Sequence, residues 1–297
     1  MRFLVTGGAG FIGSHLVPRL SVRGPVTVLD DLSSGKKGNL TGVPCTFLQG
    51  SVLDPAPLAE ACAGATHVFH LAALVSVPES VSHPARCHEI NVEGTRRVLA
   101  AAARAGARRL VLASSCAVYG NEPTMPKTES SPVAPASPYA NSKLAGEKLC
   151  AEAEIPAVSL RFFNVYGPRQ DPRGPYAAAV PKFLEAARAG SPLTIFGDGH
   201  QTRDFVYIDD VTAALEHAAL SPSLSGVYNV ASGHSVSVLH LAELILDLTG
   251  LRSEIHHGPA RPGDILHSSA SIEKLRATGW KPSFDLAAGL KEILSEN

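Results

Sequence analysis

Two residues of this 297-residue chain, Tyr139 and Lys143, have the types and the spacing of a proton-transfer pair. The segment that starts at Pro138 is predicted to be a helix, and residues four apart share one face of a helix. A nearby ammonium group favours the phenolate and lowers a tyrosine pKa that is ordinarily about 10. A tyrosine tuned in this way can act as a general base near neutral pH. Ser114 and Ser115 end the strand expected just before this helix. They are either ligand-facing hydroxyls or ordinary turn serines.

A glycine-rich segment near the N-terminus has the composition of a phosphate-binding turn. Gly7, Gly10 and Gly13 follow a predicted strand, residues 3–6, and open a predicted helix, residues 12–22. The missing side chains allow a tight turn and a close approach of a pyrophosphate, and the helix N-terminus offers free N–H groups. The segment therefore predicts a dinucleotide site. The alternative is an ordinary glycine-rich turn between a strand and a helix.

Asp30 ends the second predicted strand, near the spacing of ~20 residues at which a ribose-binding acid follows such glycines. A carboxylate there accepts hydrogen bonds from both ribose hydroxyls and repels a 2′-phosphate, which favours NAD over NADP. The alternative role of Asp30 is to cap the turn over residues 31–35. At the end of the fourth predicted strand, Leu71, Ala72 and Ala73 form a shelf of small residues for the adenosine and pyrophosphate. His70, just before them, is expected to pack in the core.

The first half of the chain alternates short β-branched runs with longer helical patterns. This alternation predicts an α/β fold with a Rossmann-like, doubly wound parallel sheet and helices on both faces. Pro18, inside the first helix, is expected to kink it. The predicted strands are 3–6, 26–29, 46–49, 67–71, 109–113 and 158–162, and the predicted helices are 12–22, 55–62, 84–105 and 138–153.

After about residue 165 the alternation loosens. Strands are predicted near 193–196 and 204–207, and helices near 177–189, 211–220, 238–248 and 272–277. We therefore expect a cofactor domain over residues 1–165. A smaller substrate-binding lobe is expected over residues 166–297, with some of its segments returning to the main sheet.

Composition excludes several classes of protein. Hydrophobic residues make up 45% of the chain, and 26 Gly and 22 Pro are too few for a low-complexity sequence. The net charge is −1 and basic residues occur as isolated pairs, so no nucleic-acid partner is expected. Five cysteines without a C-x-x-C pair argue against a disulfide framework and favour a cytoplasmic location. Neither a signal peptide, a membrane span nor a metal site is predicted.

Several segments resemble the extended short-chain dehydrogenase/reductase family. The resemblance covers nearly the whole chain, and within the family it is strongest to UDP-hexose 4-epimerases. Residues 176–182 are similar to the branch that includes UDP-N-acetylglucosamine 4-epimerases. The segments that carry the resemblance are 6–13, 91–95, 114–120, 139–143, 161–170 and 203–205.

The resemblance implies NAD-dependent epimerisation at C4 of a UDP-hexose. Tyr139 would take the proton of the sugar 4-hydroxyl, Ser115 would hydrogen-bond that hydroxyl, and Lys143 would hold the nicotinamide ribose. A 4-keto sugar would turn over in the site before it is reduced on its other face, so NAD would be retained. The residues implied to bind NAD are Gly7, Gly10, Phe11, Ile12, Gly13, Asp30, Ser51, Val52, Leu71, Ala72, Ala73, Asn91, Tyr139, Lys143 and Phe162.

The resemblance also implies a UDP-sugar site and a homodimer through the helices near 84–105 and 138–153. Asn164, Arg203 and Arg261 would bind the phosphates, and Phe196 would lie against uracil. Ser268 is small and would leave room for an N-acetyl group at C2 of the sugar. The full set implied to bind substrate is Ser76, Ser115, Asn164, Val180, Phe196, Arg203, Arg261, Asp264 and Ser268. The simpler alternatives are an ion pair of Arg203 with Asp204 or Asp209, core packing of Phe196, and a turn role for Ser268.

Two departures from the family pattern and three alternatives remain. Ser51 stands where an acid usually meets the adenine amine, and Cys116 follows Ser115, where it is interpreted as a packing residue. Residues 115–117 contain no acid, unlike those of dehydratases and decarboxylases, and Asp171 would repel the carboxylate of a uronic acid. A 4-ketoreductase that uses NAD(P)H, another sugar-nucleotide-modifying member of the family, and an NAD-sensing binding protein are the alternative functions.

Overall fold

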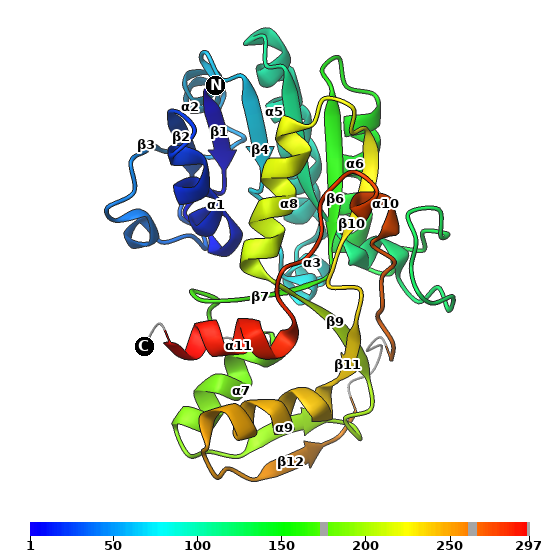
Figure 1. Cartoon of the computed structure of the whole chain (residues 1–297). Coiled ribbons are helices and arrows are strands. Elements are labelled where there is room, and N and C mark those ends of the chain that lie inside the picture. The colour runs from blue at the N-terminus through cyan, green and yellow to red at the C-terminus, as the bar shows by residue number, and fades with distance from the viewer. Residues whose placement is uncertain (173–177, 261–265, 296–297) are drawn as a thin grey trace.

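The computed structural model of the protein describes residues 1–172, 178–260 and 266–295. Within these residues, seven strands form one sheet in the order β10-β6-β5-β4-β1-β2-β3 (Figure 1). Every neighbouring pair in this sheet is parallel. The predicted parallel α/β fold is therefore confirmed. The strands are β1 (Phe3–Thr6), β2 (Val26–Asp30), β3 (Thr46–Gln49), β4 (His67–His70), β5 (Arg109–Ser115), β6 (Ala157–Phe162) and β10 (Gly226–Val230).

Successive residues of a strand point to opposite faces of the sheet, so apolar side chains lie on both faces here, and helices cover both faces. Phe3 and Val5 of β1 pack in the cluster that contains the apolar residues of α1 and α8. Leu4, between them, packs with α2 and α5 on the other side. The covering helices are α1 (Phe11–Ser21), α8 (Ile208–Leu220), α2 (Pro55–Cys62), α5 (Gly94–Arg104) and α6 (Pro138–Ala151).

The long helix predicted over residues 84–105 is present as three consecutive helical segments. These are α4 (Pro84–His88), the π-helical turn η2 (Glu89–Glu93) and α5. Single π turns occur frequently at functional positions. Here the turn contains the buried Asn91, whose Oδ1 accepts from the Leu74 N–H at 2.7 Å and whose Nδ2 donates to the Leu74 carbonyl at 2.9 Å. The π turn is thereby tied to the segment that follows β4.

Helix α1 continues through Pro18 as one helix of 11 residues. A proline has no N–H, so the carbonyl of Ser14 lacks its usual helical partner. Nη1 of Arg169 donates to that carbonyl at 2.9 Å. Arg169 has a left-handed backbone conformation, with φ of 65°. On the same turn of α1, Nε2 of His15 lies 3.0 Å from the Pro168 carbonyl oxygen. Residues 168 and 169 are thus docked onto α1.

The smaller lobe lies beyond the carboxyl ends of the strands of the main sheet (Figure 1). One of its sheets has the order β11-β9-β7, and β12 pairs with β8. The later segments α8, β10 and α10 (Glu273–Arg276) return to the main sheet, where β10 forms the edge next to β6. The lobe contains β7 (Asn164–Tyr166), α7 (Ala179–Arg188), β8 (Leu193–Phe196), β9 (Thr202–Tyr207), β11 (Ser235–Ser237), α9 (Val238–Thr249), β12 (Ile255–Gly258) and α11 (Leu286–Ser295).

Short helices follow three strands of the main sheet. They are η1 (Lys37–Leu40) after β2, α3 (Val77–Ser82) after β4, and η3 (Cys116–Tyr119) after β5. Because the sheet is parallel, these connections leave from the same edge and surround one region. The sequence patterns did not predict α3, α11, β7, β10, β11 or β12.

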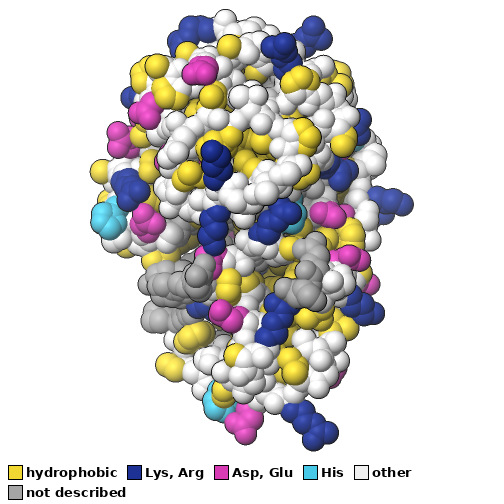
Figure 2. Space-filling model, turned by 90° about the vertical axis from the view of Figure 1, so that its left-hand side faces the viewer, with side chains coloured by type: hydrophobic (Ala, Val, Ile, Leu, Met, Phe, Trp, Pro, Cys, Tyr) yellow, Lys and Arg dark blue, Asp and Glu magenta, His cyan; other side chains and the backbone are white. Residues whose placement is uncertain are grey.

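The surface mixes both signs of charge. Figure 2 shows Lys and Arg side chains scattered among Asp and Glu over one face of the molecule. In the part of the chain that the structure describes, none of the helices is both long enough and apolar enough to cross a bilayer. The same residues include no group of three His, Cys, Asp or Glu side chains placed to hold a metal ion. All five cysteines are free thiols.

Candidate active site

A cavity of about 820 Å³ opens at the carboxyl ends of the strands of the main sheet. Parallel sheets bind ligands at this edge, where the strand order changes direction, and here that point lies between β1 and β4. The cavity brings together most of the residues that the sequence assigned to the cofactor and to catalysis. Those that line it are Gly7, Gly10, Phe11, Ile12, Gly13, Asp30, Ser51, Val52, Leu71, Ala72, Ala73, Ser76, Ser115, Tyr139, Lys143 and Phe162.

The glycine-rich turn between β1 and α1 leaves no space for side chains. Gly7 has φ of 71°, and a Cβ added there would lie 2.7 Å from the Ala72 backbone nitrogen. A Cβ on Gly13 would lie 2.3 Å from the Gly7 carbonyl oxygen. Gly10 is the N-cap residue of α1, and no side chain caps this helix end. The turn therefore presents bare backbone and a helix N-terminus to the cavity, which suits a pyrophosphate.

Asp30, at the end of β2, is 6% exposed and anchored by backbone donors. Its Oδ2 accepts from the Ala9 N–H and its Oδ1 from the Leu32 N–H, each at 2.9 Å. Burial raises the pKa of this carboxyl above its ordinary value, while the two backbone hydrogen bonds act in the opposite direction. Each oxygen keeps a lone pair for the cavity, which is the geometry required to accept hydrogen bonds from a ribose diol.

Ser51 and Val52 line the cavity after β3, at the place expected for the adenine. The Ser51 hydroxyl accepts from the Leu53 N–H at 3.2 Å, and the Ser51 N–H donates to Asp54 Oδ2 at 3.1 Å. The carboxylate of Asp54 thus supports this turn, and its side chain makes no capping hydrogen bond to α2. Ser51 therefore presents a neutral side chain at this part of the cavity wall, and its contact with the adenine stays a prediction.

Ser115, Tyr139 and Lys143 meet in the wall of the cavity because α6 packs against β5. Ser115 is the last residue of β5, and the other two lie on the first turns of α6. Nζ of Lys143 lies 5.7 Å from the centroid of the Tyr139 ring and donates to the Ala113 carbonyl at 2.9 Å. The Ser115 hydroxyl accepts from the Ala117 N–H at 3.1 Å and lies close enough to the phenol of Tyr139 to lower its pKa.

Burial is the largest influence on the pKa values of both Tyr139 and Lys143, and the expectation that Lys143 lowers the pKa of Tyr139 stays a prediction. Burial raises the pKa of Tyr139 to about 12, and the hydrogen bond with Ser115 is the influence that lowers it. Burial also lowers the pKa of Lys143 to about 8. Burial therefore favours the neutral phenol of Tyr139, and a positive charge close to the phenol acts in the opposite direction.

His70 is buried and Cys116 is partly buried close to this group, and neither is suited to act as an acid or a base near neutral pH. His70 Nδ1 lies 2.7 Å from Thr6 Oγ1, and its Nε2 lies 3.0 Å from Thr95 Oγ1. Burial and the charge of Lys143 lower the pKa of His70 to about 3, so its ring is neutral. Burial raises the pKa of the Cys116 thiol to about 11, which is consistent with a packing role.

Residues 3–231 match the sequence profile of the NAD dependent epimerase/dehydratase family. This match spans more than half of the chain. The chain belongs to this family. As a member of an NAD-dependent family it takes NAD as its cofactor, and the side-chain-free turn around Gly7 and Gly13 together with the buried carboxylate of Asp30 fits that molecule.

Epimerases of this family are among the chain's close relatives. It is 41% identical, over 99% of this chain and 97% of the relative, to a UDP-glucose 4-epimerase of Mycolicibacterium smegmatis. A solved UDP-N-acetylglucosamine 4-epimerase of Methanobrevibacter ruminantium, in complex with UDP-N-acetylmuramic acid, is 39% identical with a TM-score of 0.93, covering 100% of this chain and 99% of that chain. The UDP-glucose 4-epimerase of Thermus thermophilus in complex with NAD is also 39% identical, with a TM-score of 0.90 and 99% and 98% coverage. More distant relatives are named as a decarboxylase and a dehydratase.

Several residues that the family resemblance assigned to ligands lie outside the cavity wall. Asn91 is bonded to Leu74 and also donates to Ser142 Oγ at 2.9 Å, so it supports the wall from behind. Val180 is 2% exposed in the core of the smaller lobe. Phe196 is half-buried at the end of β8, beside Gly258 of β12. Their roles in binding stay predictions.

The remaining substrate residues of the resemblance gather around β9. Asn164 Nδ2 donates to the Asp204 carbonyl at 3.1 Å, and Arg203 lies close enough to Cys116 to lower the pKa of its thiol. The Ser268 N–H donates to the Thr202 carbonyl at 3.1 Å. This group therefore lies next to η3, immediately after Ser115. Arg261 and Asp264 lie outside the described residues.

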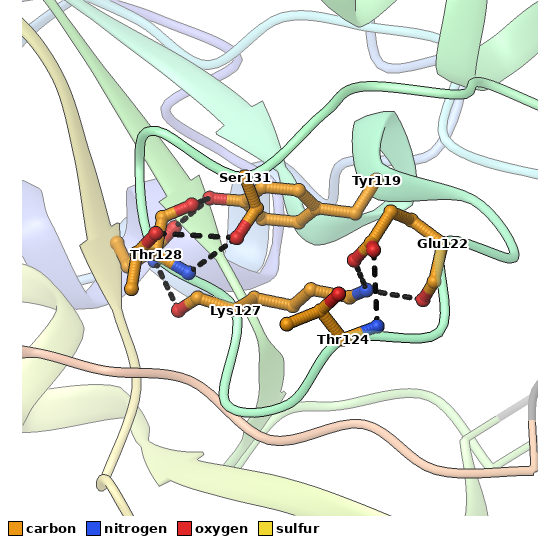
Figure 3. Close-up of polar contacts among 7 residues, drawn as sticks. Tyr119, Glu122, Thr124, Lys127, Thr128 and Ser131 are labelled. Atoms are coloured by element: carbon orange, nitrogen blue, oxygen red, sulfur yellow. Dashed lines mark hydrogen bonds and ion pairs between the residues drawn. The ribbon is translucent and has the colours of Figure 1, made fainter.

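Polar contacts hold together the loop after η3, which includes Glu122, Lys127 and Thr128 (Figure 3). Tyr119 donates its hydroxyl to the Thr128 carbonyl at 3.0 Å and to Asn229 Oδ1 at 2.7 Å. The Lys127 ammonium contacts Glu122 and lowers the pKa of that carboxyl to about 2. The Lys127 backbone N–H donates to the Ser269 carbonyl at 2.8 Å. One loop thus connects the catalytic strand β5 with residues 268–271.

Sequence reasoning missed a second set of cavity residues, contributed by connections between elements. Arg169 was part of a segment that carried the family resemblance, yet nothing local showed that it docks on α1. Lys36 and Asp171 approach each other to 3.6 Å from opposite sides of the cavity. The cavity residues to which the sequence patterns gave no role include Lys36, Asn39, Glu79, Arg86, Ile90, Phe163, Val165, Arg169 and Gln170.

Proposed function

We propose that the protein is a UDP-hexose 4-epimerase that interconverts UDP-glucose with UDP-galactose and also UDP-N-acetylglucosamine with UDP-N-acetylgalactosamine. The observation that carries the proposal is the convergence of Ser115, Tyr139 and Lys143 in the wall of one cavity that also contains the glycine turn and Asp30. Relatives named UDP-glucose and UDP-N-acetylglucosamine 4-epimerases support the choice of branch.

Tyr139 is the proposed general base toward the sugar 4-hydroxyl. Its phenol lies beside the Ser115 hydroxyl, which already accepts a backbone N–H and so directs its own proton toward the phenol or the sugar oxygen. Lys143 is held by the Ala113 carbonyl at 2.9 Å with its remaining N–H groups available to a ribose. Positioned proton transfer of this kind contributes about 10²–10⁴-fold to the rate.

NAD, held by the glycine turn, Asp30, Tyr139 and Lys143, supplies when bound a positively charged nicotinamide that accepts the hydrogen of C4 with its electron pair and returns it. The resulting 4-keto sugar keeps its UDP anchored while the ring presents its other face. Tyr139 then returns its proton to O4. Because the exchange is closed, the protein needs no added reductant.

The lack of an acid at residues 115–117 favours epimerisation over the other reactions of the family. The residues that follow Ser115 are Cys116 and Ala117, and burial raises the pKa of the Cys116 thiol to about 11. Neither side chain can drive elimination of water, which needs an acid and a base. Asp171 lines the cavity, where its charge would repel a uronic acid.

The test is incubation of the purified protein with UDP-galactose, UDP-N-acetylgalactosamine or UDP-glucuronate, without added cofactor, and separation of the products. The first two should equilibrate with their C4 epimers, and the third should remain unchanged. Tyr139→Phe should lower kcat by about 10²–10⁴-fold while bound NAD is retained. Tyr228→Phe is the control, because that ring packs under Lys274 away from the cavity.

Each alternative predicts a different result. A need for added NAD(P)H indicates a 4-ketoreductase, whereas loss of water or carbon dioxide indicates another branch of the family. A change in cofactor fluorescence without turnover indicates an NAD-sensing binding protein. Turnover of Tyr139→Phe within about threefold of the parent contradicts the assignment of the base.

The division of labour and the assembly belong to the same proposal. Residues 1–165 bind NAD and residues 166–297 mainly bind the UDP-sugar, although α8, β10 and α10 pack on the main sheet. The homodimer through the helices near 84–105 and 138–153 is proposed from the family resemblance and is tested by light scattering. The free thiols accord with a cytoplasmic location.

A further inference from the structure

The backbone N–H of Tyr139 has a partner from outside its own helix. Pro138 starts α6, so the N–H groups of the next residues lack partners within the helix. Ser137, the N-cap residue, serves one of them, because its Oγ accepts from the Ala140 N–H at 3.1 Å. Its carbonyl accepts the first regular helical bond, from the Asn141 N–H, at 2.9 Å. The N–H of Tyr139 donates to Oγ of Ser80, on α3, at 3.1 Å.

Ser80 is fully buried, and its hydroxyl is bonded in both directions. It accepts from Tyr139 and donates to the Val77 carbonyl at 2.6 Å. Helix α3 begins at Ser76, whose Oγ accepts from the Glu79 N–H at 3.2 Å, and both Ser76 and Glu79 line the cavity. One hydroxyl therefore joins the cavity wall to the backbone of the proposed base.

We propose that Ser80 is a positioning residue for Tyr139, which sets the place of the phenol relative to Ser115 and the sugar. This inference rests on the proposed role of Tyr139 as the base. Without the Ser80 hydroxyl, the partly buried N–H of Tyr139 loses its acceptor, and a donor left unpaired away from water is unfavourable. The first turn of α6 then relaxes, and the phenol at the far end of the side chain moves. A misplacement of about 1 Å at a reacting group can lower a rate by about 10²-fold.

The test compares Ser80→Ala with Ser82→Ala. Ser82 lies on the same short helix but is exposed, and its hydroxyl contacts neighbouring groups, namely the Pro78 and Glu79 carbonyls and His83 Nδ1. Measured per bound NAD, kcat of Ser80→Ala should fall by about 10–100-fold with KM within about twofold of the parent. The Ser82→Ala variant should match the parent. Thermal unfolding and NAD content of each variant show whether it is folded.

A purely structural role predicts a different pattern. It lowers the amount of NAD-loaded protein but leaves kcat per bound NAD unchanged, and that result overturns the proposal. So does a Ser80→Ala variant whose kcat matches that of Ser82→Ala. If Ser80→Ala does not fold, Ser80→Cys, which keeps a hydrogen-bonding group, replaces it with the same expected direction.

If the proposed 4-epimerase function is wrong, the measurements give a result that differs from failure of the inference on Ser80. Epimerisation, elimination of water and decarboxylation all begin with oxidation at C4 of the sugar. The rate at which UDP-glucose or UDP-N-acetylglucosamine produces the absorbance of reduced nicotinamide is therefore a second readout. A parent that shows this signal without epimer formation refutes the 4-epimerase but still reports the effect of Ser80→Ala. A parent that shows the signal with equal rates in both serine variants refutes the inference on Ser80.

Discussion

Replacement of Asp30 by asparagine should convert a pronounced preference for NAD over NADP into a weak one. The side chain is almost isosteric, so the change is one of charge and hydrogen bonding. Each carboxylate oxygen accepts a backbone N–H at 2.9 Å, one from Ala9 in the glycine turn and one from Leu32. An amide can satisfy only one of these donors and turns its own NH₂ group toward the other.

The magnitude follows from the bonds that the carboxylate would make to the ribose. A hydrogen bond to a charged group contributes about 1.5–3 kcal/mol, which corresponds to about 10–150-fold in affinity. Burial raises the pKa of Asp30, so desolvation offsets part of the gain from its charge. We therefore expect the Kd for NAD to rise by about 10–30-fold in Asp30→Asn. The Kd for NADP should change much less, because the repulsion of its 2′-phosphate is also removed.

The assay is titration of NAD and NADP into protein stripped of nucleotide, followed by calorimetry. Asp198→Asn is the matched control, because it removes one charge from an exposed carboxylate that does not line the cavity and that accepts from the His200 N–H at 2.9 Å. Its Kd for NAD should stay within about threefold of the parent, as expected for a screened surface charge. An unchanged NAD/NADP ratio in Asp30→Asn, or equal effects of the two variants, would show that Asp30 is only a cap for the turn over residues 31–35.

Two further predictions concern specificity and pH. Ser268→Tyr should lower kcat/KM for the N-acetyl sugars by about 10-fold or more, because overpacking costs about 1–3 kcal/mol. The kcat/KM values for UDP-glucose and UDP-galactose should be spared. Equal losses for both substrate pairs would show that another residue limits the space at C2 of the sugar. The pKa of His70 is about 3 in the folded protein, so only the unfolded chain binds this proton as pH falls below about 6.5. From about pH 6.5 to about pH 5 the parent should therefore lose about 2 kcal/mol more unfolding free energy than His70→Gln, measured by urea unfolding; parallel curves would contradict the burial of a neutral ring.

The parts of the site that sequence predicts well are local. The glycine turn and Asp30 lie on adjacent elements, and bare backbone at a strand–helix junction has few other uses. Tyr139 and Lys143 share a helix face by spacing alone. These positions all line the cavity in the structure.

The parts that sequence could not predict depend on partners far along the chain. Strand β10 carries the polar Asn229 in its middle, which obscures an apolar pattern. Asn229 can be fully buried in the structure because Tyr119, Lys127 and Ser271 all form hydrogen bonds with its side-chain amide. The sequence gives no indication of a role for Ser80, because that role depends on a hydrogen bond to Tyr139, far along the chain. Burial, which raises the pKa of Tyr139 to about 12, is likewise a tertiary property.

Pro18 is unfavourable for α1 as an isolated helix, but it allows a residue of the cavity wall to bind this helix. Pro18 leaves the Ser14 carbonyl to Arg169, which lines the cavity from a left-handed backbone conformation. Judged as a helix alone, α1 would gain about 3 kcal/mol if Pro18 became alanine. The new N–H would compete with the guanidinium for the same oxygen. A ranking of substitutions by helix propensity would therefore put Pro18→Ala first. The same substitution would weaken the contact between α1 of the cofactor domain and Arg169, in the segment that leads into the sugar lobe.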